Sequence, residues 1–208
     1  MTTINATQSH RQQTFVMIKP DGVQRNLIGE VITRFERVGL KLVALKMIVP
    51  DTERLSNHYS KDDVWYESKG QKTVDNMIKR GVVPSKPAIE YGKDIIRALI
   101  DYMSSGPAIL MIWEGNKAME VVKKLVGGTE PTTSDIGTIR GDYTLDSYDK
   151  ATEDNRAVRN LMHCTDPADG EGEAAREIKI WFSPSEIVNY KHVQEAILYD
   201  PTISGILL

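Results

Sequence analysis

The spacing of hydrophobic residues changes along the first third of the chain, and these changes predict a strand, a helix and a second strand. Residues 14–19 are rich in β-forming side chains and stop at a Pro-Asp-Gly turn, so they predict the first strand. The next apolar residues recur every three or four positions, which predicts a helix with Asn26 as its N-cap and Gly39 beyond its end. Residues 40–49 predict a long second strand, and Asp51 is placed to cap a short helix after it.

A polar stretch with several glycines and prolines follows at residues 60–92, where only residues 74–79 predict a helical piece. We interpret this stretch as an insertion within one core, because regular periodicity resumes directly after it. A Ser-Pro-Ser-Glu capping box at 183–186 predicts a further short helix. The other predicted elements are helices at 95–103, 116–126 and 171–181, strands at 108–113 and 160–164, and one helical turn near 153–158.

Without the insertion, the strands and helices follow the order β-α-β-β-α-β. This order is typical of the ferredoxin-like split βαβ unit, an α+β fold in which a four-stranded antiparallel sheet carries helices on one face. We therefore expect residues 14–208 to form a single domain with a helical insertion at 60–92 and a C-terminal extension. Residues 1–13 are polar and predict a disordered tail.

Composition narrows the class of protein. The 208 residues include 26 Lys and Arg against 29 Asp and Glu, a net charge of −3 without a basic stripe, so nucleic acid is not an expected partner. The longest apolar run is six residues, at 108–113, whereas a membrane span needs about 20. The polar N-terminus and the single cysteine, Cys164, argue against a secretory signal and a disulfide framework. We expect a cytoplasmic protein that does not enter membranes.

His163 is a candidate catalytic residue, although an isolated histidine on a short strand is more often structural. Neutral imidazole is a good nucleophile near pH 7, whereas a serine hydroxyl needs a base. The neighbouring Cys164 suggests a Cys–His pair, but adjacent residues of a strand point to opposite faces, so we do not expect one.

Several co-linear segments give His163 a context. They are residues 18–25, 105–107, 113–115, 137–142, 160–163 and 177–182. In this order they resemble the nucleoside diphosphate kinase family over most of residues 14–190. The combination is far more specific than any one of the segments alone.

The resemblance implies a ping-pong reaction that moves the γ-phosphoryl group of a nucleoside triphosphate to a nucleoside diphosphate through phosphohistidine at His163. It places Glu177 and Thr165 as supporting groups that orient the imidazole ring, and it counts Lys19 with the catalytic residues. Mg²⁺ is implied as the cofactor, held mainly by the nucleotide phosphates, with no metal-ligand cluster on the protein.

The resemblance also implies a set of nucleotide-binding residues. Lys19 and Asn160 match positions that reach the ribose hydroxyls, and Arg140 and Thr129 match phosphate-binding positions. Tyr59 matches a tyrosine that lines the site. An isolated lysine or arginine is more often a solvated charge, so these roles depend on the matched segments.

Two departures from the family pattern concern the site. Lys123 stands where the family usually has arginine, so a bidentate phosphate contact becomes a point charge. The stretch at 60–92 is longer than the usual helical hairpin, which normally brings the aromatic residue that stacks on the base. Trp65 is our first candidate for that role and Tyr66 the second.

Two alternatives remain beside the kinase. One is a catalytically silent nucleotide-binding scaffold of the same fold, because a fold does not determine a function. The other is a phosphohistidine relay to a protein partner, which would not need Lys19 and Asn160 to read a ribose. The resemblance further implies a homo-oligomer, either a hexamer or a tetramer.

Overall fold

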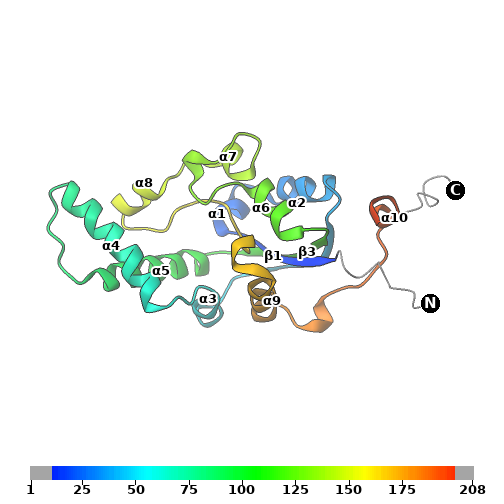
Figure 1. The fold of residues 1–208 in the computed structure, drawn as a ribbon, viewed down its shortest axis with the longest axis horizontal. Coiled ribbons are helices and arrows are strands. Elements are labelled where there is room, and N and C mark those ends of the chain that lie inside the picture. The colour runs from blue at the N-terminus through cyan, green and yellow to red at the C-terminus, as the bar shows by residue number, and fades with distance from the viewer. Residues whose placement is uncertain (1–10, 200–208) are drawn as a thin grey trace.

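One antiparallel sheet organises the chain, and the computed structural model describes residues 11–199 (Figure 1). The four strands lie in the order β2-β3-β1-β4. All neighbouring pairs run antiparallel, so the predicted ferredoxin-like topology is confirmed. The strands are β1 (Gln12–Ile18), β2 (Lys41–Ile48), β3 (Ala108–Gly115) and β4 (Met162–Cys164).

Helices cover both faces of the sheet, so the prediction of helices on one face was wrong. The α-helices are α1 (Pro20–Gln24), α2 (Ile28–Arg37), α3 (Thr52–His58), α4 (Asp63–Lys79), α5 (Ala88–Ser104), α6 (Ala118–Val126), α7 (Ile139–Tyr143), α8 (Tyr148–Glu153), α9 (Gly170–Trp181) and α10 (Val193–Tyr199). Helices α2 and α6 pack on one face, and α3, α5 and α9 pack on the other (Figure 1). Within residues 11–199, no helix is long and apolar enough to cross a membrane.

Strand β1 lies between two apolar clusters because its side chains alternate between the faces of the sheet. Phe15 and Met17 belong to the cluster under α3, α5 and α9. Val16 and Ile18 belong to the cluster under α2 and α6. All four side chains are fully buried, so β1 is the centre of the core.

Most of residues 60–92 form a helical hairpin with α5, whereas the sequence predicts a largely irregular excursion. Helix α4 is seventeen residues long, and α5 starts earlier than the periodicity predicts. Two glycines let the helices touch backbone to backbone. A Cβ at Gly70 would lie 1.7 Å from the Ala88 carbonyl oxygen, and one at Gly92 would lie 2.0 Å from the Tyr66 carbonyl oxygen. The hairpin projects from one end of the sheet (Figure 1).

Three local predictions differ from the structure. Asn26 has a φ of 58° and joins α1 to α2, and the N-cap of α2 is Leu27. Gln12 and Gln13 pair with β3 and so belong to β1, while the first ten residues of the predicted tail lie outside the described residues. The helical turn predicted at 153–158 occurs earlier in the chain, as α8.

The predicted helix caps are confirmed at other ends. Asp51 accepts a hydrogen bond from the Arg54 backbone N–H at 2.8 Å, which starts α3. Ser183 and Glu186 form the capping box of a short 3₁₀ turn. Gly39, just past α2, has a φ of 89°, the left-handed conformation that glycine adopts without strain.

We predict that Gly92→Ala destabilises the protein, because its new Cβ would force α4 and α5 apart. The expected loss in the free energy of unfolding is about 1–3 kcal/mol, as for other overpacked interiors. Gly172→Ala in α9 is the matched control, since among the described residues outside its own stretch of helix no atom lies within 4 Å of its Cβ position. The control should gain up to about 1 kcal/mol from helix propensity. Denaturant unfolding measures both, and equal effects would contradict the backbone contact.

Candidate active site

His163 lies in the middle of β4 and faces α9. Its partner in the β1–β4 register is Met17, which belongs to the cluster under α3, α5 and α9, so His163 points to the same face. There its Nε2 lies 2.8 Å from Glu177 Oε1. The hydroxyl of Thr165 donates to the other carboxylate oxygen, Oε2. The three residues predicted as nucleophile and supporting groups therefore meet.

Glu177 is held as a carboxylate in a buried place. Burial opposes its ionisation, but the electrostatic attraction to the His163 ring and the hydrogen bonds from His163 and Thr165 outweigh it and lower the pKa of Glu177. Because an ionised carboxylate only accepts, the proton lies on His163 Nε2 and the lone pair lies on Nδ1. The His163 side chain is 22% exposed against 4% for Glu177, so a substrate can reach the ring.

Lys19 and Asn160 form a buried pair beside this group. Lys19 Nζ donates to Asn160 Oδ1 at 2.7 Å, and Asn160 Nδ2 donates to the Thr129 carbonyl oxygen at 3.2 Å. Burial, reinforced by the charge of Arg140, lowers the pKa of Lys19 to about 7. Lys19 is therefore poised between its neutral and cationic forms near neutral pH.

Arg140 is buried and bonded to backbone. Its Nε donates to the Asn160 carbonyl oxygen at 3.1 Å, and its Nη2 donates to that of Met162 at 2.7 Å. Its Nη1 donates to the carbonyl oxygens of Gly127 and Gly128 at 3.1 and 3.0 Å. Carbonyl oxygens satisfy the donors without cancelling the charge, so the guanidinium joins two loops as a buried cation.

The turn between Asn160 and His163 has a strained backbone that several hydrogen bonds hold in place. Leu161 has a φ of 64°, a left-handed conformation that costs a leucine about 1–2 kcal/mol. Its N–H donates to Asp21 Oδ2 at 3.1 Å, and its carbonyl oxygen accepts from the Lys19 N–H at 2.8 Å. Together with Arg140 on the flanking carbonyls, these contacts fix where the turn presents its side chains.

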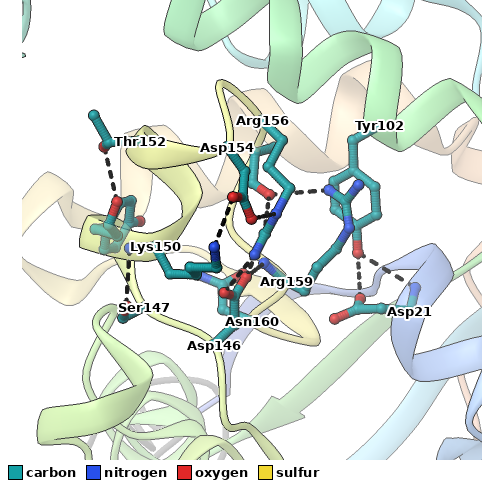
Figure 2. Close-up of polar contacts among 12 residues, drawn as sticks. Asp21, Tyr102, Asp146, Ser147, Lys150, Thr152, Asp154, Arg156, Arg159 and Asn160 are labelled. Atoms are coloured by element: carbon teal, nitrogen blue, oxygen red, sulfur yellow. Dashed lines mark hydrogen bonds and ion pairs between the residues drawn. The ribbon is translucent and has the colours of Figure 1, made fainter.

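A polar network from α5 and the loop after α8 supports Asp21 (Figure 2). The Tyr102 hydroxyl donates to Asp21 Oδ1 and accepts from the Asp21 backbone N–H. The Arg159 guanidinium lies 3.8 Å from the centre of the Tyr102 ring. Asp146 accepts from both Nη atoms of Arg156 and from the Arg159 N–H. The network ties the strained turn to the α5 helix.

Comparison with known proteins identifies the family. Residues 12–96 and 88–187 match the model of the family described as nucleoside diphosphate kinase. A nucleoside diphosphate kinase from Pyrobaculum aerophilum is 43% identical over 182 residues, which are 85% of this chain and 98% of that protein. The chain belongs to the nucleoside diphosphate kinase family.

Solved structures agree with this family. A crystal structure of an NDP kinase from Pyrobaculum aerophilum has a TM-score of 0.79 and 41% identity, and the match covers 86% of this chain and 100% of that one. A nucleoside diphosphate kinase from Borrelia burgdorferi has a TM-score of 0.73 and 36% identity, with 91% and 97% of the two chains covered. That structure is described as a transition state mimic with bound vanadate and ADP.

As a nucleoside diphosphate kinase, the chain is a phosphotransferase that moves the γ-phosphoryl group of a nucleoside triphosphate to a nucleoside diphosphate. The kinase predicted from the sequence is therefore confirmed. The silent scaffold and the protein relay, which the sequence left open, are not supported by these relatives.

The other predicted nucleotide-binding residues are buried to different extents. Lys123, on α6, pairs its Nζ with Asp166 Oδ2 at 2.8 Å and stays partly exposed. Tyr59 is buried with its ring centre 5.9 Å from that of His163, and burial raises the pKa of its hydroxyl. Thr129 is exposed in the loop after α6. Their contacts with a nucleotide stay predictions.

Trp65 lies in the first turn of α4 and packs, partly buried, against the cluster under α3, α5 and α9. The Tyr66 ring is edge-on to it at 5.7 Å, and Lys69 Nζ lies 5.8 Å from its ring centre. Both candidate stacking residues thus take part in packing the hairpin. Base stacking on Trp65 stays a prediction.

Cys164 lies on the opposite face of β4 from His163. It belongs to the cluster under α2 and α6, and burial raises the pKa of its thiol. The expectation that these neighbours do not form a Cys–His pair is confirmed.

A metal ion would fit poorly between His163, Glu177 and His58, although one donor atom from each lies within 4.8 Å of the others. Trp181 Nε1–H donates to His58 Nδ1 at 3.2 Å, which leaves the proton of the neutral ring on Nε2. His163 Nε2 also carries a proton, because it faces Glu177. An ion would have to displace both protons.

Sequence reasoning missed four residues of the site: Asp21, Tyr102, His58 and Trp181. Asp21 was read only as part of a turn. The helical spacing of Glu177 and Trp181, four residues apart, was the available signal that both face the sheet. Tyr102 carries no such signal, because its partner lies 81 residues away.

We predict that Tyr102→Phe impairs the kinase, because Asp21 loses the donor that helps it hold Leu161. The loss should be about 1–2 kcal/mol in the free energy of unfolding and about tenfold in kcat/KM. Tyr190→Phe is the matched control, since its hydroxyl bonds the Leu42 carbonyl oxygen far from the site. Steady-state kinetics measure kcat/KM and denaturant unfolding measures the stability of both variants. Full activity of Tyr102→Phe would refute the supporting role.

We predict that ADP binding weakens as the pH rises from about 7 to about 9. Lys19, with its pKa lowered to about 7, loses its proton over this range, and an anionic ligand favours the charged form. Binding then takes up a proton, with a limiting slope of about tenfold per pH unit. Calorimetry of Lys19→Met should show weaker binding with a flatter pH dependence. If the ADP affinity of both proteins fell equally with pH, Lys19 would be excluded as the cause of the pH dependence.

Proposed function

We propose that His163 Nδ1 is the atom that carries the phosphoryl group between the two nucleotides. The observation that supports this is the hydrogen bond from His163 Nε2 to Glu177, which leaves the Nδ1 lone pair free on a partly exposed ring. A nucleophile oriented by a buried carboxylate, which is itself held by Thr165, is the arrangement that phosphoryl transfer through histidine requires.

In the first half-reaction the Nδ1 lone pair forms a bond to the γ-phosphorus. The bond from that phosphorus to the β–γ bridging oxygen breaks, and its electron pair leaves with the nucleoside diphosphate. In the second half-reaction a terminal β-phosphate oxygen of another nucleoside diphosphate attacks the same phosphorus, and the N–P bond returns its pair to Nδ1. Glu177 stabilises the positive charge that develops on the ring.

The proposed binding residues differ in how deeply they are buried. Lys19 and Asn160 reach the ribose hydroxyls from their buried pair. Arg140 and Lys123 attract the phosphates, and Thr129 offers them a hydroxyl from the loop after α6. Arg140 supplies charge at a fixed point because its donors are bound to backbone, whereas Lys123 must exchange Asp166 for the phosphate. Tyr59 lines the site, and Trp65 stacks on the base.

Mg²⁺ would be held by the phosphate oxygens of the nucleotide, where it would neutralise charge. The ion prefers six oxygen ligands, and the carboxylate nearest the nucleophile has both of its oxygens engaged by His163 and Thr165. The site therefore suits an ion that arrives with its substrate.

The active form is a cytoplasmic homo-oligomer, a hexamer or a tetramer. Strand β2 is at the edge of the sheet and exposes Leu45 and Met47 by 47% and 55%, and Val49, the residue after its end, is 62% exposed. An apolar edge of this kind favours contact with another copy. The native mass of the assembly tests this part of the proposal.

We predict that His163→Ala abolishes both nucleotide phosphorylation and the acid-labile phosphoenzyme formed with ATP and Mg²⁺. His192→Ala, a change of another histidine placed after the 3₁₀ turn at 184–186, is the control and should keep both. Labelled ATP and a second nucleoside diphosphate provide the assay. Phosphoenzyme in His163→Ala would show that another residue is the acceptor.

A further inference from the structure

His58 stands behind the catalytic carboxylate and has no role in the mechanism so far. It is the last residue of α3, and its side chain is fully buried. Its Nε2 lies 3.7 Å from Glu177 Oε1, the oxygen that also faces His163. The rings of His58 and His163 meet edge to face with centres 4.5 Å apart. Glu177 Oε1 therefore lies between two imidazole rings.

Trp181 determines which nitrogen of His58 carries the proton. An indole N–H can only donate, and it donates to His58 Nδ1 at 3.2 Å, so Nδ1 must offer its lone pair. The proton of the neutral ring is then on Nε2, which makes no hydrogen bond within the described part of the chain and lies 3.7 Å from Glu177 Oε1. Trp181 is itself fixed by stacking on Phe15, with the two rings 7° from parallel.

The surroundings also keep His58 uncharged. Burial lowers its pKa well below 6.5, and electrostatic repulsion from His163, Arg176 and Lys61 acts in the same direction. Glu177 is the one group facing it that favours protonation. His58 consequently presents an N–H dipole to the carboxylate without adding a second charge beside the ring that becomes positive during transfer.

We propose that His58 is a positioning residue for phosphoryl transfer: held by Trp181 as the neutral Nε2–H tautomer, it keeps Glu177 ionised and directed at His163. The opposite tautomer would place a lone pair against the carboxylate and repel it. The inference rests on the proposed role of His163 as the nucleophile. It concerns the rate of phosphorylation, because neither His58 nor Trp181 contributes a predicted nucleotide contact.

The first measurement is the protonation of His58 itself in the full-length wild-type chain. Ring ¹⁵N chemical shifts distinguish the two neutral tautomers and the imidazolium, and the chain has four histidines to resolve. His58→Gln identifies which signals belong to His58. We expect an unprotonated Nδ1 and a protonated Nε2 from about pH 6 to about pH 8. A protonated Nδ1, as the other tautomer or as the imidazolium, would overturn the proposal.

The second measurement is the rate of His163 phosphorylation by ATP in a single turnover. Trp181→Phe keeps a ring against Phe15 but removes the donor, and we expect the rate to fall about tenfold with unchanged KM for ATP. In Trp181→Phe, the loss of the phosphorylation rate on the acidic side of the pH profile should begin at a higher pH than in the wild type, because His58 can then protonate more easily. Trp113→Phe is the matched control, because Trp113 is a fully buried tryptophan in the other cluster and its Nε1 has no hydrogen-bond partner among residues 11–199.

A third comparison separates positioning from packing. His58→Gln can place an amide N–H near the Nε2 position and should retain more of the phosphorylation rate than His58→Leu. A rate in Trp181→Phe within about twofold of the Trp113→Phe rate, or equal rates in the two His58 variants, would overturn the proposal. Failure of the proposed function has a different result, namely phosphoenzyme formation in His163→Ala.

Discussion

The pairing of β4 with β1 sets the position of every group in the active site. The register places His163 opposite Met17, on the face that α9 covers, and a slip of one residue would turn Cys164 to that face instead. A three-residue strand is too short to fix its own register. Hydrogen bonds beyond both of its ends do so, from the Thr165 N–H to the Phe15 carbonyl oxygen and from the Lys19 N–H to the Leu161 carbonyl oxygen.

The site buries two cationic side chains, Arg140 and Lys19, without an anionic partner for either among the residues that the structure describes, and this determines its electrostatic properties. Arg140 satisfies its donors with carbonyl oxygens, and Lys19 satisfies its amine with the Asn160 amide oxygen. Neither contact neutralises a charge, so burial disfavours both cations and lowers the pKa of each group. A polyphosphate would supply the missing negative charge, which explains how a chain of net charge −3 can bind an anion locally.

The α4–α5 hairpin is coupled to the site through the short connection after α3. His58 ends α3, Tyr59 follows it with its ring 4.5 Å from that of His58, and α4 begins at Asp63. Tyr59 also shares an apolar cluster with Met103 of α5. The position of the hairpin and the surroundings of His163 therefore depend on the same buried aromatic residue.

The sequence by itself determined the order of the strands, the principal helices and the group formed by His163, Glu177 and Thr165. Periodicity and matched segments are local signals, and they were sufficient for these features. They did not show the α4–α5 hairpin at its full length, because its two helices meet at Gly70 and Gly92 through backbone contacts, which add no apolar residue to the sequence pattern. Tertiary structure alone decided that helices cover both faces of the sheet. It alone joined Tyr102 to Asp21 and Trp181 to His58, since hydrogen bonds across 81 and 123 residues leave no periodic trace in a single sequence.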